Sequence, residues 1–142
     1  MLDQLMIPDL TASEREELAH AAASLRADGW ADFITVERLL TEWIELSRTV
    51  DTYLMIVDDY TNDVTSRDGL ELAVAKCSPT LRAKLVACIE PADQTFKSRT
   101  KLDTEGVLAY FFRIDDLPGW WWRRVPETGP LAEALKSANR VR

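Results

Sequence analysis

The densest polar cluster of the sequence lies between residues 58 and 68. The aspartates there are Asp58, Asp59, Asp63 and Asp68, and Arg67 lies among them. Asp59 and Asp63 are four positions apart, so on a helix both carboxylates lie on one face. Such groupings of oxygen ligands suit a hard divalent cation, with water or a substrate phosphate completing its shell. In the structural alternative, these residues cap helices, form turns and pair with Arg67 where two helices meet.

A second carboxylate pair lies upstream, at Glu42 and Glu45. Two helices that each present such a pair could hold Mg²⁺ between them, with Glu42, Glu45, Asp59 and Asp63 as ligands. This pattern resembles the all-α nucleoside triphosphate pyrophosphohydrolases, which use Glu-x-x-Glu on one helix and Glu-x-x-Asp on the next. The chain differs in its second pair, because Asp59 and Asp63 are four positions apart. The resemblance implies a magnesium-dependent nucleotide hydrolase, whereas the structural alternative is a solvated helix face.

A run of aromatic and basic residues, Trp120-Trp121-Trp122-Arg123-Arg124, is the second feature that could bind a ligand. In a strand, alternate side chains face opposite sides, so Trp121 and Arg123 would share one face. Tryptophan beside arginine is typical of protein interaction surfaces. Stacked indoles can also receive single-stranded nucleic acid. In the structural alternative, a hairpin buries all three indoles and the two arginines extend over them.

Groups for covalent or acid–base catalysis are few. The chain has one histidine, His20, and two cysteines, Cys77 and Cys88. His20 lies about 200° around the first predicted helix from Leu18, which we assign to the buried side, so His20 should face solvent. Both cysteines fall on apolar helix faces, where reduced cysteine acts as a core residue. Because the chain also lacks a nucleophile elbow, a phosphate loop and a dinucleotide fingerprint, we predict no catalytic residue.

Helical periodicity predicts a bundle of about five to six helices over about residues 11–102. The first helix covers residues 11–28, begins with a capping box at Thr11 and Glu14, and ends at Gly29. The second covers about residues 32–47. Polar residues 49–52 then break the chain before a short helix, or less favourably a strand, at residues 53–60.

Two further helices are predicted downstream. Thr65 and Asp68 form a capping pair for a short helix that ends at Lys76. Ser78-Pro79 is a strong start signal for the next helix. Pro91 lies inside the apolar pattern of that helix and should kink it or divide it in two.

From Gly106 the pattern changes to that of strands. Residues 107–114 and 120–125 favour β structure around a turn, so a β-hairpin is predicted over about residues 107–125. A short amphipathic helix should follow over about residues 130–138. The predicted fold class is therefore mainly α, a single domain of residues 1–142 that forms a helical bundle with one C-terminal β-hairpin.

The formal net charge of the chain is −7. An acidic surface repels phosphate backbones, so nucleic acid is not expected as a partner. The N-terminus lacks the basic and apolar regions of a signal peptide. Apolar runs such as residues 54–57 are far below the ~20 residues that span a bilayer. We therefore expect a cytoplasmic protein with no membrane partner.

These observations lead to three functional hypotheses. The first, which we favour, is a small acidic non-catalytic protein that neutralises a basic protein partner, as immunity proteins and antitoxins do. It needs no cofactor, and its partner contacts would be Asp58, Asp59, Asp63, Asp68, Trp121 and Arg123. The second is the magnesium-dependent enzyme, and the third is an accessory protein that self-associates through the Trp-rich hairpin. The sequence leaves the oligomeric state and the identity of the partner open.

Overall fold

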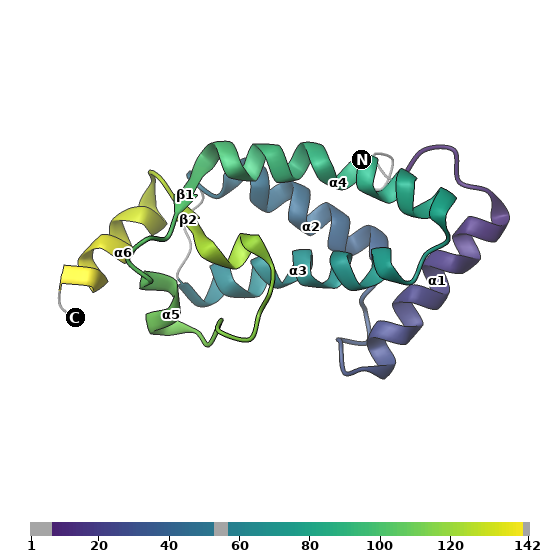
Figure 1. Cartoon of the computed structure of the whole chain (residues 1–142), viewed down its shortest axis with the longest axis horizontal. Helices are drawn as coiled ribbons and strands as arrows, with labels where there is room; N and C mark the ends of the chain where they lie inside the picture. The colour runs from purple at the N-terminus through teal and green to yellow at the C-terminus, as the bar shows by residue number, and fades with distance from the viewer. Residues whose placement is uncertain (1–6, 53–56, 141–142) are drawn as a thin grey trace.

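The structure is a computed structural model that describes residues 7–52 and 57–140, and the described chain is mainly helical (Figure 1). Within these ranges it forms six α-helices, one short 3-10 helix and two strands. In chain order the elements are α1 (Ala12–Ala27), α2 (Val36–Thr49), α3 (Val57–Ala75), α4 (Pro79–Arg99), β1 (Thr100–Leu102), α5 (Val107–Phe111), the 3-10 helix η2 (Trp120–Arg123), β2 (Arg124–Pro126) and α6 (Pro130–Arg140). The predicted mainly α class with one pair of antiparallel strands is confirmed.

Helix α1 begins and ends where its capping residues predict. The Thr11 hydroxyl accepts a hydrogen bond from the Glu14 amide at 3.0 Å, and the Thr11 amide donates to the Glu14 carboxylate at 2.9 Å. The helix ends before Gly29, whose φ of 106° lies in the left-handed region that glycine adopts without strain. His20 is exposed on this helix, as its position predicts.

Helix α2 starts a few residues later than the apolar pattern predicts, because the side chain of Thr35 forms its N-cap. The Thr35 hydroxyl accepts from the Arg38 amide at 3.0 Å. The helix ends at Thr49, at the predicted break. Residues 53–56 lie outside the described part of the chain, so the choice between helix and strand for Tyr53–Val57 is untested over most of its length.

Helix α3 is one continuous helix, so the predicted helix start at Thr65 and Asp68 is wrong. The Thr65 hydroxyl instead donates to the carbonyl of Thr61, one turn earlier, at 2.9 Å. A threonine inside a helix can satisfy its hydroxyl in this way without capping anything. The Asp68 side chain turns away from its own helix, as described below.

Helix α4 starts at the predicted signal, where the Ser78 hydroxyl accepts from the Leu81 amide at 3.5 Å and Pro79 is the first helical residue. Pro91 does not divide this helix, which continues to Arg99. Ile89, Ala92 and Phe96 are buried on either side of the proline. We attribute the continuity of the helix to this packing, which offsets the loss of one backbone hydrogen bond.

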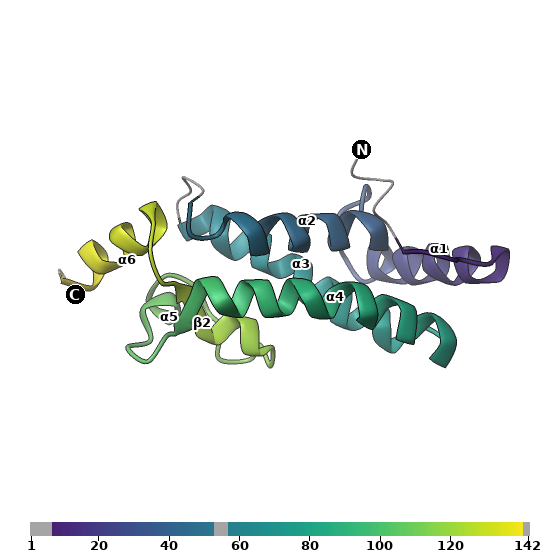
Figure 2. The same cartoon turned by 90° about the horizontal axis from the view of Figure 1, so that it is seen from above.

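Helix α2 forms most of its contacts with α3 and α4, and the core lies between these three helices. Trp43 of α2 is fully buried there, and its ring centroid lies 4.7 Å from that of Phe96 on α4. Figures 1 and 2 both place α1 at one end of this assembly and α5 and α6 at the other. The middle of the helical assembly is therefore held by α2, α3 and α4.

The two strands do not lie where the sequence pattern predicts them. Strand β1 pairs antiparallel with β2, with Thr100 opposite Pro126. Residues 103–123 connect the two strands, where a hairpin would have a short turn. The predicted strand at residues 107–114 is wrong, because Val107–Phe111 is helix α5. Both carboxylate oxygens of Asp103 accept backbone N–H groups at its start, from Val107 and Leu108, each at 2.9 Å. This capping overrides the strand propensity of the aromatic and branched residues.

The C-terminal helix is confirmed as α6, which begins after Gly129. Gly129 has a φ of 96°, and a Cβ atom at this position would overlap the backbone of Asp51. Asp51 also pairs with Arg99 at the end of α4, at 3.1 Å. The ends of α2 and α4 and the start of α6 therefore meet at one place.

Candidate functional site

Three consecutive residues of α3 bond to three different elements. The Ser66 hydroxyl donates to the Glu42 carboxylate on α2 at 2.9 Å. Arg67 binds Asp93 on α4, and Asp68 binds the indoles of η2. One turn of α3 therefore connects α2, α4 and η2.

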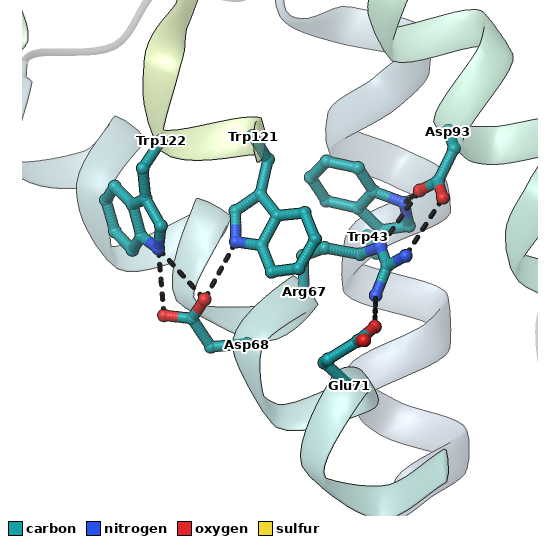
Figure 3. A network of polar contacts seen from close by, with 7 residues as sticks. All are labelled: Trp43, Arg67, Asp68, Glu71, Asp93, Trp121 and Trp122. Atoms are coloured by element: carbon teal, nitrogen blue, oxygen red, sulfur yellow. Dashed lines mark hydrogen bonds and ion pairs between the residues drawn. The ribbon is translucent and has the colours of Figure 1, made fainter. Parts of the chain in front are cut away.

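Arg67 and Asp93 form the most buried ion pair of this turn (Figure 3). The guanidinium donates to both carboxylate oxygens of Asp93, at 2.9 Å each, and to Glu71 at 3.0 Å. The indole N–H of Trp43 donates to the same Asp93 carboxylate at 2.9 Å. Burial disfavours the charged guanidinium, but Asp93 and Glu71 outweigh it and raise the pKa of Arg67. These contacts hold α2, α3 and α4 together through charge-assisted hydrogen bonds.

Asp68 is not the exposed partner contact that the sequence predicts. Its carboxylate accepts the indole N–H of Trp121 at 2.8 Å and that of Trp122 at 2.9 and 3.0 Å (Figure 3). Burial raises the pKa of Asp68, and the two indole hydrogen bonds and Arg67 oppose this effect. The carboxylate therefore acts as the common acceptor for two tryptophans.

Trp121 is also turned inward, with only 4% of its surface exposed, so its prediction as a surface contact is wrong. In a strand, Trp121 and Trp122 would face opposite sides. The 3-10 turn of η2 replaces that alternation, and both side chains are buried. Trp120 is only partly buried, so the alternative in which all three indoles are buried holds for two of them.

Arg123 is exposed, as a partner contact requires, but its guanidinium holds the preceding loop. It donates to the carbonyl oxygens of Ile114 at 3.1 Å and Leu117 at 2.9 Å. These bonds fold residues 114–117 back against η2. The side chain therefore has a structural role even though it reaches the surface.

The remaining predicted acidic residues gather where α2 and α3 run side by side. Asp59 is exposed and Asp63 is half-buried. Burial raises the pKa of Asp63, and the negative charges of Glu42 and Asp59 raise it further. We call Glu42, Asp59 and Asp63 the acidic cluster. The side chain of Asp58 lies outside the described part of the structure.

The magnesium alternative needs Glu42, Glu45, Asp59 and Asp63 to converge. Glu45 is exposed, and Glu42 already binds Arg38 at 3.3 Å and Ser66. Among the described residues, no group of three or more His, Cys, Asp and Glu side chains is arranged to hold a metal ion. The geometry therefore gives this ligand set no support.

No protein-family model, curated protein or solved structure matches the chain. A functional site can therefore be proposed only from the chain's own geometry and chemistry. Within the described ranges, no helix combines the length and the apolar character needed to cross a membrane.

An apolar pocket of about 480 Å³ lies between α3 and the segment that leads into η2. Three indoles, those of Trp30, Trp120 and Trp121, line it together with Asp68, Glu71 and Leu72. We call it the Trp pocket. Its size falls within the range of small-ligand sites.

Sequence reasoning missed the Trp pocket because it joins segments that are far apart in the chain. One local signal was available in Gly69, an isolated glycine inside a helix, which often marks a close approach of another group. A Cβ atom on Gly69 would lie 2.8 Å from Leu39 and 3.0 Å from the Trp30 ring. Glycine here therefore lets Trp30 pack directly on the backbone of α3.

A second pocket, of about 320 Å³, lies between α3 and α4 and contains two cations that stack on the same tryptophans. The guanidinium of Arg67 lies 4.4 Å from the Trp121 ring centroid, and the Lys97 ammonium lies 4.5 Å from that of Trp120. Both cations line this second pocket, and neither lines the Trp pocket. Two indoles of the Trp pocket therefore stack on cations that are not part of the lining of that pocket.

Proposed function

We propose that this protein is a non-catalytic acidic binding protein that captures and neutralises a basic protein partner, in the manner of immunity proteins and antitoxins. The net charge of −7 favours such a partner, because opposite charge accelerates association and disfavours wrong partners. Nucleic acid and anionic surfaces are disfavoured by the same charge.

The acidic cluster is the observation that carries the proposal. Burial is the largest cause of the raised pKa of Asp63, and Glu42 on α2 and Asp59 on α3 are close enough for their charges to raise it further. Like charges held together in this way cost stability. A lysine or arginine of a partner would remove that cost on docking, so the partner gains from a repulsion that the unbound protein carries.

The contact surface that we propose differs from the one predicted by sequence alone. Asp59 and Asp63 are retained, and Glu42 joins them from the neighbouring helix. Asp68 and Trp121 leave the contact set, because they bind each other inside the fold. Asp58 and the exposed Arg123 stay sequence-based candidates.

The two alternative functions gain less from the structure. A magnesium-dependent hydrolase predicts that millimolar Mg²⁺ or Mn²⁺ raises the melting temperature, since a ligand of the native state stabilises it. Self-association through the Trp-rich segment predicts a dimer in light scattering. That alternative relied on a strand edge over residues 120–125, whereas residues 120–123 form η2 and turn two indoles inward.

The decisive experiment is affinity capture from an extract of the source cell with three forms of the protein. The test variant is Asp59→Lys/Asp63→Lys. The control is Glu16→Lys/Asp28→Lys, which makes the same change in net charge at two exposed positions on α1 and just after it. Circular dichroism confirms that each variant is folded.

We expect wild type and control to retain a basic protein in stoichiometric amount and the test variant to lose it. With that protein purified, the loss should lie mainly in the association rate and should shrink as salt is added. Equal retention by the two double variants would contradict the proposal. So would retention of no protein, or of an acidic one, by the wild type.

A further inference from the structure

The Trp pocket has a lining that fits one class of ligand. Its walls are three indoles and apolar side chains, and its charged groups are the carboxylates of Asp68 and Glu71. No Lys, Arg or His of the described chain lines it. We infer that this pocket binds an organic cation, an alkylammonium or guanidinium group carried on an apolar body.

The physical basis is the attraction between a cation and the negative face of an aromatic ring, which is strongest for tryptophan. Trp30 and Trp120 are partly exposed and present their rings from different segments of the chain. The two carboxylates add a negative potential, and Asp68 is partly buried, where electrostatic attraction is screened less. Glu71 is 63% exposed, lines the pocket and pairs with Arg67 at 3.0 Å.

The protein already uses this chemistry on two of the same tryptophans. Arg67 lies over Trp121 at 4.4 Å and Lys97 over Trp120 at 4.5 Å. One carboxylate, that of Asp93, already matches the charge of Arg67 with both of its oxygens, so the charge of Glu71 adds to the negative potential of the Trp pocket. A cation that binds in the Trp pocket therefore has to come from outside the described chain.

Other ligand classes fit less well. A phosphate or carboxylate would meet Asp68 and Glu71 and no basic side chain. The indole N–H of Trp121 could have served as a donor, but it is bound to Asp68 at 2.8 Å. A neutral apolar molecule would fit the walls and gain nothing from the carboxylates, so comparison with a neutral isostere tests the inference directly.

This inference goes beyond the proposed function, because it concerns a different surface and holds for a free small molecule as well as for a side chain of a partner. Purified protein is titrated by calorimetry and ligand-observed NMR with benzyltrimethylammonium and with choline. The neutral isostere of choline, 3,3-dimethylbutan-1-ol, and the anion benzenesulfonate serve as comparisons. N-acetyl-arginine amide is compared with its neutral analogue, N-acetyl-citrulline amide. This comparison tests whether the bound cation can be an arginine side chain of a partner.

The test variant is Leu72→Lys, which places a positive charge in the lining at an exposed position. Its control is Val86→Lys, an equally exposed apolar position on α4 that lines the second pocket. We expect choline to bind at least about tenfold more tightly than its neutral isostere. Leu72→Lys should abolish cation binding, and Val86→Lys should leave it within about twofold of wild type.

Equal binding of choline and its neutral isostere would overturn the inference, as would cation binding that survives Leu72→Lys or no cation binding at millimolar concentration. If the arginine amide binds more tightly than both ammonium probes, the natural ligand is assigned to a side chain of a partner. If the ammonium probes bind more tightly, the ligand is assigned to a small molecule. Asp59→Lys/Asp63→Lys should bind the probes like wild type. A failure of the proposed function therefore leaves this result unaffected.

Discussion

The carboxylate of Asp68 receives the indole N–H of Trp122 at both of its oxygens, at 2.9 and 3.0 Å (Figure 3). Trp122 is 1% exposed, so this bond joins the middle of α3 to a side chain that has lost nearly all contact with water. A buried indole N–H without an acceptor is costly. Asp68 therefore decides whether η2 can pack on the bundle.

Replacing Asp68 should destabilise the fold. Asp68→Ala leaves the N–H groups of Trp121 and Trp122 without their acceptor and should lower the free energy of unfolding by about 2–4 kcal/mol. Asp115→Ala, at an exposed loop position, should change it by less than about 0.5 kcal/mol. Urea denaturation followed by circular dichroism measures both, and equal stabilities would show that Asp68 contributes no more than an exposed aspartate.

Loss of Asp93 should be the most damaging change of charge in the chain. Asp93→Ala leaves the buried Arg67 guanidinium without its bidentate partner and should cost about 3–5 kcal/mol. Glu133→Ala breaks an exposed pair with Lys136 and should cost less than about 1 kcal/mol. Thermal melts compare the two variants. The double variant Arg67→Met/Asp93→Leu should recover only part of the loss, because it removes both buried charges but still leaves the Trp43 N–H without its acceptor.

Gly129 should tolerate alanine far less well than Gly29. Both glycines have a positive φ, 96° and 106°, so alanine is strained at either site. Only at Gly129 would the added Cβ also overlap a backbone, that of Asp51, whereas the space around Gly29 is open. Gly29→Ala should cost about 1 kcal/mol and Gly129→Ala clearly more. A difference within the error of chemical denaturation would contradict the close approach at Asp51.

Asp63 should make stability depend on pH in an unusual direction. Its pKa is raised in the folded protein, so the folded state takes up this proton before the unfolded state does. At neutral pH, ionised Asp63 lowers the free energy of unfolding. This effect decreases as the pH falls through the raised pKa and is gone below the ordinary aspartate value of about 3.9.

Asp63→Asn should therefore stabilise the protein at neutral pH by a few tenths of a kcal/mol, about the size of a like-charge pair on a helix. The advantage should vanish below about pH 4. Melting temperatures of the variant and the wild type, measured across this range, give the difference. A variant less stable than wild type at neutral pH would mean that Asp63 makes a favourable contact as an ion.

The local start signals of the helices could be predicted from the sequence. The capping box at Thr11 and Glu14 and the Ser78-Pro79 start depend on side chains within one turn, and local spacing specifies them. Thr65 and Asp68 have the same local spacing and misled the prediction. The Thr65 hydroxyl bonds to Thr61 inside the same helix, and Asp68 bonds to the distant tryptophans of η2, a partner that local spacing does not indicate.

The segment from Val107 to Val125 could not be predicted from propensity. Its aromatic and branched residues favour strands, yet Asp103 caps a helix at Val107 and a 3-10 turn carries Trp121 and Trp122 inward. The Trp pocket was missed for the same reason, since Trp30 and Glu71 are brought together only by packing. The acidic cluster was partly predicted, because the spacing of Asp59 and Asp63 is local and only Glu42 comes from another helix.

The bonds of Ser66, Arg67 and Asp68 have a consequence for how the molecule comes apart. The elements α2, α4 and η2 are each bonded to the same turn of α3. None of them can detach without breaking a hydrogen bond of that turn. Cooperativity is thus built into the centre of the molecule, and its amide hydrogens should exchange with solvent only through global opening. Partial fraying should be confined to the outlying helices α1 and α6, which lie at the two ends of the assembly (Figure 1).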